Sequence, residues 1–408
     1  MIQLDNHPLL NPDIAASVFE HLGDDSRTVY RGMRVCRLWW SEGHKRLWRG
    51  ARLDDLYSHV QEVERRLYFS RYVESLTIPS GDSILSNGQM DLQSLDLRRL
   101  KSLLMHQTNL INIHPPNIAS LIVPSLRSLT FRYDSIYVQG QTDRECIIFL
   151  NALMPVCHKL TTLDLDLNCS GALLPLLVRL FTRLSAIEHL EIGDLAEDLH
   201  SHMHGQDILR LMLNRPRLVT LGFSHAVDFA EHAVQALLAG MGAYWSLPSL
   251  QSLSRPVFFS SRAAALLLHR LPNLKCLEFE LEEFHGSWGD TLEQTFDALS
   301  QLKQLDALEL QIAVGECNLN GTWLVRLAGL KKLECLALLF DTDPKVNLTG
   351  AQLAALLSGL PRLISLVLHM GTFEVSCSVD EKSTIDTAFA RIKRLDLGGL
   401  TITTQHRV

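Results

Sequence analysis

Apolar residues recur along most of the chain in a six-residue pattern, L-x-x-L-x-L, with polar residues between them. Twelve segments follow this pattern wholly or nearly, and they begin at Val73, Leu92, Leu126, Leu160, Ile187, Leu218, Leu250, Leu274, Leu305, Leu333, Leu363 and Ile392. From Ile187 onward, successive segments begin 31, 32, 24, 31, 28, 30 and 29 residues apart. Chance explains one or two such matches in a leucine-rich chain, whereas twelve at near-regular spacing indicate an internal repeat.

Each repeat predicts one strand followed by a helix or a loop. The last two apolar residues of the pattern are two positions apart, as in a strand that directs alternate side chains into one core. Segments between the strands have helical spacing, for example Leu173 to Leu180 and Leu353 to Leu357. One such unit cannot bury its own apolar face, but a stack of units can. The pattern therefore predicts an α/β solenoid over residues 73–408, with about eleven or twelve repeats.

The repeat resembles that of leucine-rich-repeat proteins, whose units are commonly about 20–29 residues long. This resemblance implies a horseshoe with parallel strands inside and helices outside. The repeat is degenerate, because the asparagine that the family places after the third apolar residue stands only at Asn168. The segment that begins at Leu250 has Arg255 at an apolar position, and residues 118–123 are a candidate for a further, poorer copy.

The first seventy residues have a helical period and few leucines. One amphipathic helix opens after Asn11-Pro12-Asp13, carries Ile14, Val18, Phe19 and Leu22, and stops at Gly23. Ser26 is expected to cap a second helix, which carries Val29, Met33, Cys36 and either Trp39 or Trp40. A third short helix is expected through Leu47 and Trp48. These patterns predict a small helical domain over residues 1–52 and a connecting helix or linker over residues 53–72.

This region resembles an F-box. The resemblance rests on four short motifs in a fixed order, namely Pro12-Asp13-Ile14, then Val18, Phe19 and Leu22, then Val35-Cys36-Arg37 with Trp39, then Leu47-Trp48. The sequence has Asn11 where the family usually has leucine before the proline. All four motifs lie within about 40 residues, directly before leucine-rich repeats, as in one class of F-box proteins.

The resemblance implies a substrate-recognition subunit of a Skp–cullin–F-box ubiquitin ligase. In that role the helical domain docks on a Skp-type adaptor, and through it on a cullin, while the repeats hold a protein substrate. The implied adaptor-binding residues are Leu10, Pro12, Ile14, Val18, Phe19, Leu22, Val35, Cys36, Trp39, Leu47 and Trp48. Residues 27–52 carry eight Arg or Lys and one acidic residue, which suits either an acidic adaptor or an ordinary solvated surface. The alternative is a non-catalytic interaction scaffold whose N-terminal helices only cap the solenoid.

Composition narrows the class of protein. The chain has 408 residues, 47% of them hydrophobic, and 78 of them are leucine, which argues against disorder. No apolar run approaches the ~20 residues of a membrane span, and no secretory signal is visible. A formal net charge of −7 argues against a nucleic-acid-binding protein. The eight cysteines lack C-x-x-C spacing, so we expect reduced thiols and a cytoplasmic or nuclear protein.

Residues between the leucines of each strand are expected on the inner face of the solenoid, where a partner can bind. Many of these residues in the middle of the chain are acidic. The candidates for substrate binding are Asp164, Asp166, Glu191, Glu278, Glu280 and Glu309. This pattern suggests a substrate with a basic segment, and the alternative is that these carboxylates only keep the surface soluble.

Candidates for chemistry are weak. His200, His202 and His204 suggest a metal cluster, but no cysteine lies near them at ligand spacing, so a polar loop is the better interpretation. Cys276 and Cys335 occupy equivalent repeat positions without a predictable activating histidine. Phosphate-binding glycine motifs, H-E-x-x-H and G-x-S-x-G are absent from the sequence. We therefore expect no metal, no cofactor and no catalytic activity.

Overall fold

The computed structural model describes residues 11–22, 25–78, 92–106, 120–132, 142–166, 173–193, 214–229, 231–241, 246–258, 260–282, 288–313, 318–341 and 345–404. Contacts divide the chain into two compact units. Unit 1 is Met1–Ile187 with Gly193–Leu199, and unit 2 is Glu188–Ile192 with His200–Val408.

Unit 1 begins with three helices, α1 (Pro12–His21), α2 (Ser26–Met33) and α3 (Arg37–Leu47). Asn11 caps α1, since its side-chain oxygen accepts a hydrogen bond from the backbone N–H of Asp13 at 2.9 Å. The expected cap at Ser26 is wrong, because Asp25 caps α2 and Ser26 is its first residue. Cys36 is the N-cap of α3 rather than part of the second helix, and both Trp39 and Trp40 therefore lie on α3.

The three helices share one small core. Its buried residues are Phe19, Val29 and Met33, and Leu22, Trp39 and Leu47 pack against them. The rings of Phe19 and Trp39 meet edge to face, with centroids 5.6 Å apart. A Cβ at Gly43 would lie 2.2 Å from Cγ of Met33, so α3 approaches α2 closely enough to require glycine. The helices therefore fold around a core of their own.

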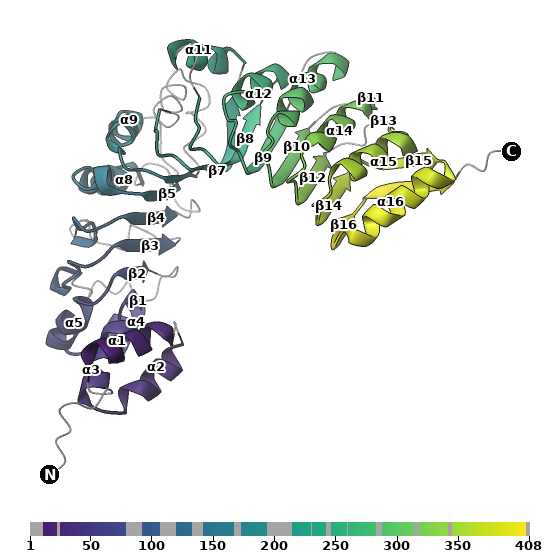
Figure 1. Cartoon of the computed structure of the whole chain (residues 1–408). Coiled ribbons are helices and arrows are strands. Elements are labelled where there is room, and N and C mark those ends of the chain that lie inside the picture. The colour runs from purple at the N-terminus through teal and green to yellow at the C-terminus, as the bar shows by residue number, and fades with distance from the viewer. Residues whose placement is uncertain are drawn as a thin grey trace. The chain divides into compact units, whose positions relative to one another are not determined.

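The remainder of unit 1 is a stack of parallel strands with helices or loops between them (Figure 1). Its elements are β1 (Gly50–Arg52), α4 (Leu53–Ser58), α5 (Val63–Ser70), β2 (Ser75–Ile78), η3 (Leu92–Ser94), β3 (Ser102–His106), β4 (Ser128–Arg132), α8 (Thr142–Leu153), η5 (Cys157–Lys159), β5 (Thr162–Asp166) and α9 (Leu174–Arg183). Equivalent leucines stand in register across β2 to β5, namely Leu76, Leu103, Leu129 and Leu163. All four are fully buried, as the repeat pattern predicts.

The strand expected from the segment at Leu92 is wrong. Leu92–Ser94 is a 3₁₀ helix, and the strand β3 instead belongs to Leu100-Lys101-Ser102-Leu103-Leu104-Met105. Two successive copies of the pattern, at 92–97 and 100–105, compete here, and the second lies 27 residues after Val73 and 26 before Leu126, close to the period of the repeat. The candidate repeat at 118–123 forms no strand in its described part, 120–123. The strand β1 was not expected from the sequence, and it pairs with β2 in parallel.

Unit 2 repeats the same strand-and-helix arrangement more regularly. Its main elements are β6 (His189–Ile192), β7 (Thr220–Phe229), α11 (Glu231–Met241), β8 (Ser252–Phe258), α12 (Ser261–Leu268), β9 (Cys276–Glu282), α13 (Trp288–Ser300), β10 (Ala307–Ala313), α14 (Thr322–Arg326), η8 (Leu327–Gly329), β12 (Cys335–Phe340), α15 (Gly350–Gly359), β14 (Ser365–His369), α16 (Val379–Arg391) and β16 (Arg394–Asp396). Two small parallel sheets join β11 (Asn318–Asn320) to β13 (Lys345–Asn347) and β15 (Thr372–Cys377) to β17 (Gly399–Thr404).

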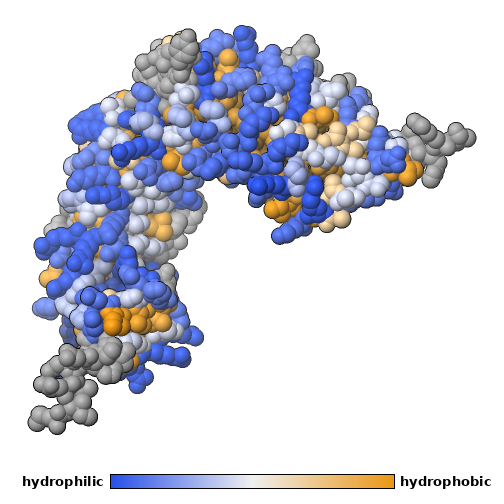
Figure 2. Space-filling model, viewed as in Figure 1, coloured by the Kyte–Doolittle hydropathy of each residue, from blue (hydrophilic) through white to orange (hydrophobic). Residues whose placement is uncertain are grey.

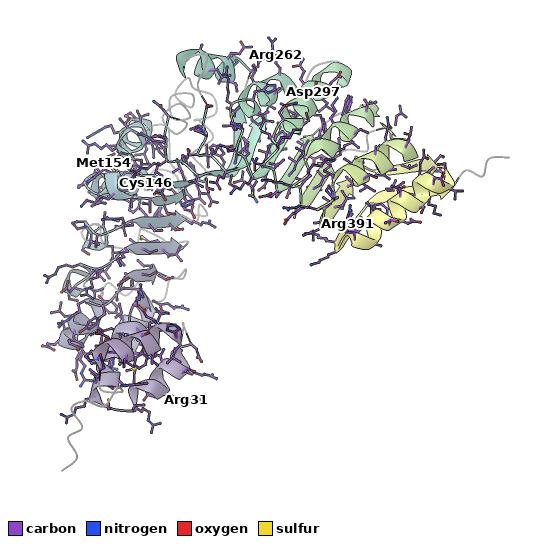
Figure 3. The ribbon with its side chains drawn as sticks, in the orientation of Figure 1. Arg31, Cys146, Met154, Arg262, Asp297 and Arg391 are labelled. Atoms are coloured by element: carbon purple, nitrogen blue, oxygen red, sulfur yellow. The ribbon has the colours of Figure 1, made fainter. Side chains whose placement is uncertain are left out.

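The helices of unit 2 lie on one side of the sheet (Figure 1). Thr349 and Gln352 form a capping box that opens α15. Ion pairs tie neighbouring helices on their outer surface, where Arg262 and Asp297 project away from the sheet (Figure 3). Arg262 pairs with Glu231 at 3.3 Å, and Arg326 pairs with Asp297.

Both units contain the repeat of strand and connecting segment that the leucine pattern predicts. The chain therefore has an α/β leucine-rich-repeat fold preceded by three helices, which confirms the predicted fold class. In the part of the chain that the structure describes, no helix is long and apolar enough to cross a membrane.

Candidate functional site

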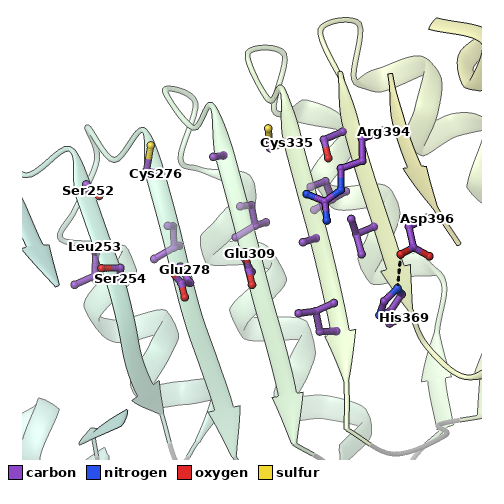
Figure 4. A pocket seen from close by; sticks show the side chains of 18 residues that line it. Ser252, Leu253, Ser254, Cys276, Glu278, Glu309, Cys335, His369, Arg394 and Asp396 are labelled. Carbon is purple, nitrogen blue, oxygen red and sulfur yellow. Dashed lines mark ion pairs between the residues drawn. The ribbon is translucent and has the colours of Figure 1, made fainter. Parts of the chain in front are cut away.

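One face of the unit 2 sheet is free of helices and bears a groove of about 550 Å³ between β8 and β16 (Figure 4). The groove exists because side chains alternate along each strand. On β9, for example, Phe279 and Leu281 are buried, whereas Cys276 and Glu278 face the groove. Strand register then places equivalent residues of successive repeats side by side.

Two rows of side chains cross the groove. The first row is Ser252, Cys276, Ala307, Cys335, Ser365 and Arg394, and the second is Ser254, Glu278, Glu309, Ala337, Val367 and Asp396. Neighbouring residues in a row stand on strands ~4.8 Å apart. The rows therefore bring together residues that are about 30 positions apart in the sequence, as the repeat requires.

An acidic pair occupies one end of the groove. Glu278 and Glu309 are in register on β9 and β10, and both project into the groove (Figure 4). Arg255 donates from Nε to Oε1 of Glu278 at 2.9 Å. For Glu309, no hydrogen bond or ion pair is found among the described residues, and its side chain is exposed. Glu309 is therefore the available carboxylate of the pair.

Arg255 reaches Glu278 through a bulge in β8. The register between β8 and β9 shifts between Ser254 and Val257, and Arg255 has a φ of 59°. This left-handed conformation is uncommon for a residue other than glycine. Arg255 stands at a position where the repeat pattern has an apolar residue. Because of the bulge, its charged side chain stays exposed there.

The centre of the groove is apolar. Ala337 and Val367 are in register on β12 and β14, and Leu339 lies one step further along β12. Val367 is only 8% exposed, so it forms the floor of the groove and does not protrude into it.

The far end of the groove carries an ion pair between His369 Nε2 and Asp396 Oδ2, which are 2.9 Å apart. The hydrogen bond from His369, with a further one from the backbone N–H of Gly398, lowers the pKa of Asp396.

The groove thiol of Cys276 is not activated. Cys276 and Cys335 are both in row one, separated by Ala307, so their strands lie ~10 Å apart, beyond disulfide reach. Burial raises the pKa of Cys276, and the nearby Asp306 and Cys335 raise it further. A raised pKa leaves less thiolate at neutral pH, which makes Cys276 a poor nucleophile.

The predicted substrate-binding residues fall into three groups. Glu278 and Glu309 line the groove, and Glu280 lies on β9 in register with Gln311 but outside the lining. Glu191 lies on β6 of unit 2. Asp164 and Asp166 lie on β5 of unit 1, where Asp164 is 7% exposed and its Oδ2 accepts two hydrogen bonds from Arg132 at 3.0 and 2.8 Å. The sequence offered no signal for the apolar section at Leu339. It showed Arg255 at an apolar position of the repeat, but it did not predict the contact of Arg255 with Glu278.

The predicted adaptor-binding residues also separate by burial. Phe19 is 1% exposed, and Leu22, Trp39 and Leu47 pack against the same core. Pro12, Ile14 and Val35 are exposed, whereas Val18, Cys36 and Trp48 are half-buried. Leu10 lies outside the described residues. Two exposed side chains add to this surface, since Tyr30 is 60% and Trp40 is 47% exposed. Figure 2 shows apolar atoms gathered on the surface of these helices.

An aromatic stack joins α3 to α5. The ring of His44 lies between Trp40, at a centroid distance of 3.7 Å, and Phe69, at 5.2 Å. Trp48 stacks on the same Phe69 at 5.0 Å. Both ring nitrogens of His44 are buried, and neither has a hydrogen-bond partner among the described residues. Burial alone lowers the pKa of His44, because a charged ring would have no partner in this stack.

We expect the stack to weaken as the pH falls. A histidine whose pKa is lowered by folding contributes stability that is complete above its unfolded value, about 6.5, and is lost at lower pH. Protection factors of backbone amides in α3 and α5, which compare each measured exchange rate with the intrinsic rate at the same pH, should therefore fall between pH 7.5 and 5.5. The variant His44→Phe should reduce this fall, and the exposed His59→Phe should not. An unchanged pH dependence in His44→Phe would contradict the assignment.

No group of three or more His, Cys, Asp or Glu in the described residues is arranged to hold a metal ion. His200, His202 and His204 lie outside those residues.

No protein-family model matches the sequence, and no curated protein matches it either. Among solved structures, the chain is similar to the crystal structure of the TLR13-ssRNA13 complex, with 15% identity and a TM-score of 0.41 over 82% of this chain. It spans 38% of that protein's length. A second similar structure is the leucine-rich-repeat-containing protein LegL7 from Legionella pneumophila, with 14% identity and a TM-score of 0.35 over 80% of this chain and 93% of that one.

Proposed function

We propose that the chain is the substrate-recognition subunit of a Skp–cullin–F-box ubiquitin ligase. In this role α1–α3 bind a Skp-type adaptor, and through it a cullin, while the helix-free face of unit 2 holds a protein substrate. The observation that carries the proposal is a self-contained three-helix core with exposed apolar side chains at Ile14, Val35 and Trp40, placed directly before the first repeat. Exposed apolar clusters of this kind mark protein-binding surfaces.

The proposed mechanism is positioning. A subunit that holds the adaptor and the substrate at once raises the local concentration of the substrate at the site of ubiquitin transfer, which other subunits supply. Arginines on α2 and α3, among them Arg31 and Arg37, are exposed and would attract an acidic adaptor surface. A ligase subunit of this kind would act in the cytoplasm or the nucleus.

A second candidate is an interaction scaffold whose helices α1–α3 only close the end of the repeat stack. It is favoured by the direct connection of α3 to β1, which pairs with β2, and by the stacking of Trp48 on Phe69. A capping role needs no exposed apolar side chains, so adaptor binding distinguishes the two candidates.

The test is binding of the full chain to a recombinant Skp-type adaptor, measured by biolayer interferometry. We expect a stable complex with the wild type and affinity at least tenfold weaker for Val35→Asp, because a charge would replace an apolar contact. The matched control is Val379→Asp on α16, since Val35 and Val379 are 57% and 60% exposed. Absence of a wild-type complex, or equal weakening by both variants, would contradict the proposal.

A further inference from the structure

The groove of unit 2 divides into sections of different chemistry, and their order is set by strand register. The section over β9 and β10 is acidic, the section over β12 and β14 is apolar, and the section over β14 and β16 combines one carboxylate with Arg394 and His369. The first two sections each favour one kind of side chain. The third section is close to neutral and therefore discriminates least between ligand side chains.

The acidic section is built to receive a cation. Glu278 and Glu309 stand on adjacent strands ~4.8 Å apart, so one cationic group placed between them can contact both carboxylates. Arg255 satisfies Glu278 from the β8 side only, and Glu309 has no ion-pair partner among the described residues. A guanidinium is well suited to this place, because its planar fork can bridge two carboxylates. This opening would reject a phosphate or a carboxylate by like-charge repulsion.

The apolar section lies directly beside the acidic one. Ala337 is the neighbour of Glu309 in the second row, and its small side chain leaves room above the sheet between Glu309 and Val367. Leu339 closes this space along β12. An aliphatic side chain placed here removes apolar surface from water at ~25 cal/mol per Å².

We infer that the groove binds an extended peptide segment of a partner protein in which an arginine or lysine is followed, two or three positions away, by an aliphatic residue. The spacing follows from the strands. The centre of the acidic section lies two strand intervals, ~10 Å, from the centre of the apolar section. In a β conformation a peptide advances ~3.3 Å per residue, and residues two apart share a face and reach this distance with a long basic side chain. In a polyproline-II conformation it advances ~3.1 Å per residue, and residues three apart share a face and span the distance.

This inference deepens the proposed function, because it rests on the assignment of the helix-free face to the substrate and names the class of segment recognised. The main contact is Glu309, and Arg255 holds Glu278 in place beside it. A charge change at Glu278 would release Arg255 as well, so Glu309 is the cleaner position for a test.

The test is selection from a phage-displayed library of random ten-residue peptides on the immobilised full chain. Enriched peptides are then synthesised with a fluorescent label, and their affinity is measured by anisotropy. We expect enrichment of Arg or Lys two or three positions from Leu, Ile or Val. Substitution Glu309→Lys should weaken binding of these peptides at least tenfold, and Val367→Asp should weaken it similarly. The matched control is Glu374→Lys on β15, an exposed glutamate outside the groove, which should leave affinity within twofold.

Enrichment of acidic peptides, absence of any enrichment, or equal affinity for wild type and Glu309→Lys would overturn the inference. Far-ultraviolet circular dichroism of each variant separates a local change from unfolding. The adaptor measurement with Val35→Asp is independent of this groove. Adaptor binding without peptide selection would therefore reject only the inference, and peptide selection without adaptor binding would reject only the ligase role.

Discussion

Replacement of Phe19 by alanine is expected to destabilise the three N-terminal helices by about 3–5 kcal/mol, the usual cost of removing a buried phenylalanine. Phe19 is 1% exposed, belongs to one buried cluster with Val29 and Met33, and its ring meets that of Trp39 edge to face. A core of so few residues has little stability to lose. We therefore expect α1–α3 to unfold locally while the repeats remain folded.

The measurement is hydrogen exchange of the full chain, because a repeat protein need not unfold in a single step. Peptides from 12–47 should lose protection in Phe19→Ala, whereas peptides from β9 to β14 should not change. The control is Val35→Ala, at an exposed position where a substitution changes stability by less than about 0.5 kcal/mol. Protection in Phe19→Ala equal to that of the wild type would show that this core does not hold the helices.

This result also matters for the adaptor proposal. The F-box resemblance assigns Phe19 to adaptor contact, yet its side chain is buried in the structure. Loss of adaptor binding in Phe19→Ala would thus report unfolding as readily as a lost contact. Exposed residues such as Ile14 and Val35 separate the two explanations.

The repeat could be predicted from the sequence because burial determines which positions of each unit must be apolar. The leucines of the motif are buried in register with those of the neighbouring strands. Their spacing in the sequence therefore matches the spacing of the residues that form the core. The error at Leu92 shows the limit. Residues 92–105 hold two successive copies of the motif. Leu92 and Leu97 are buried as well as Leu100, and only the pairing with neighbouring strands selects between the two copies.

The groove could be predicted only in part. Alternation within each strand identified Glu278 and Glu309 as outward residues, and the structure places both in the groove. Alternation alone could not show that Asp164 is covered by Arg132 of the preceding strand, because that ion pair depends on side-chain reach between repeats. Arg255 visibly interrupts the apolar pattern. Its exposed side chain depends on a left-handed backbone conformation and a bulge, which the pattern of apolar residues does not encode.

Replacement of Gly359 by valine is expected to separate two neighbouring repeats. Gly359 ends α15, and a Cβ at this position would lie 2.3 Å from Cβ of Ala328 and 2.6 Å from its backbone oxygen, in the preceding repeat. Backbone atoms cannot turn aside as a flexible side chain can, so α15 must move away from η8. Overpacking of this kind costs about 1–3 kcal/mol, and we expect the upper end because the contact involves backbone.

The chain offers a matched control. Gly329 occupies the same place in the preceding repeat, four residues before the first leucine of its strand motif, as Gly359 does. Among the described residues, a Cβ at Gly329 would meet only Nζ of Lys303, at 3.0 Å, which is the end of a flexible side chain and can shift. Gly329→Val should therefore change the urea midpoint little, whereas Gly359→Val should lower it and speed hydrogen exchange in β12 and β14. Since each repeat is stabilised mainly by its neighbours, the loss should be largest at this interface and fade with distance along unit 2. Equal effects of the two substitutions would show that the contact with Ala328 does not hold the repeats together.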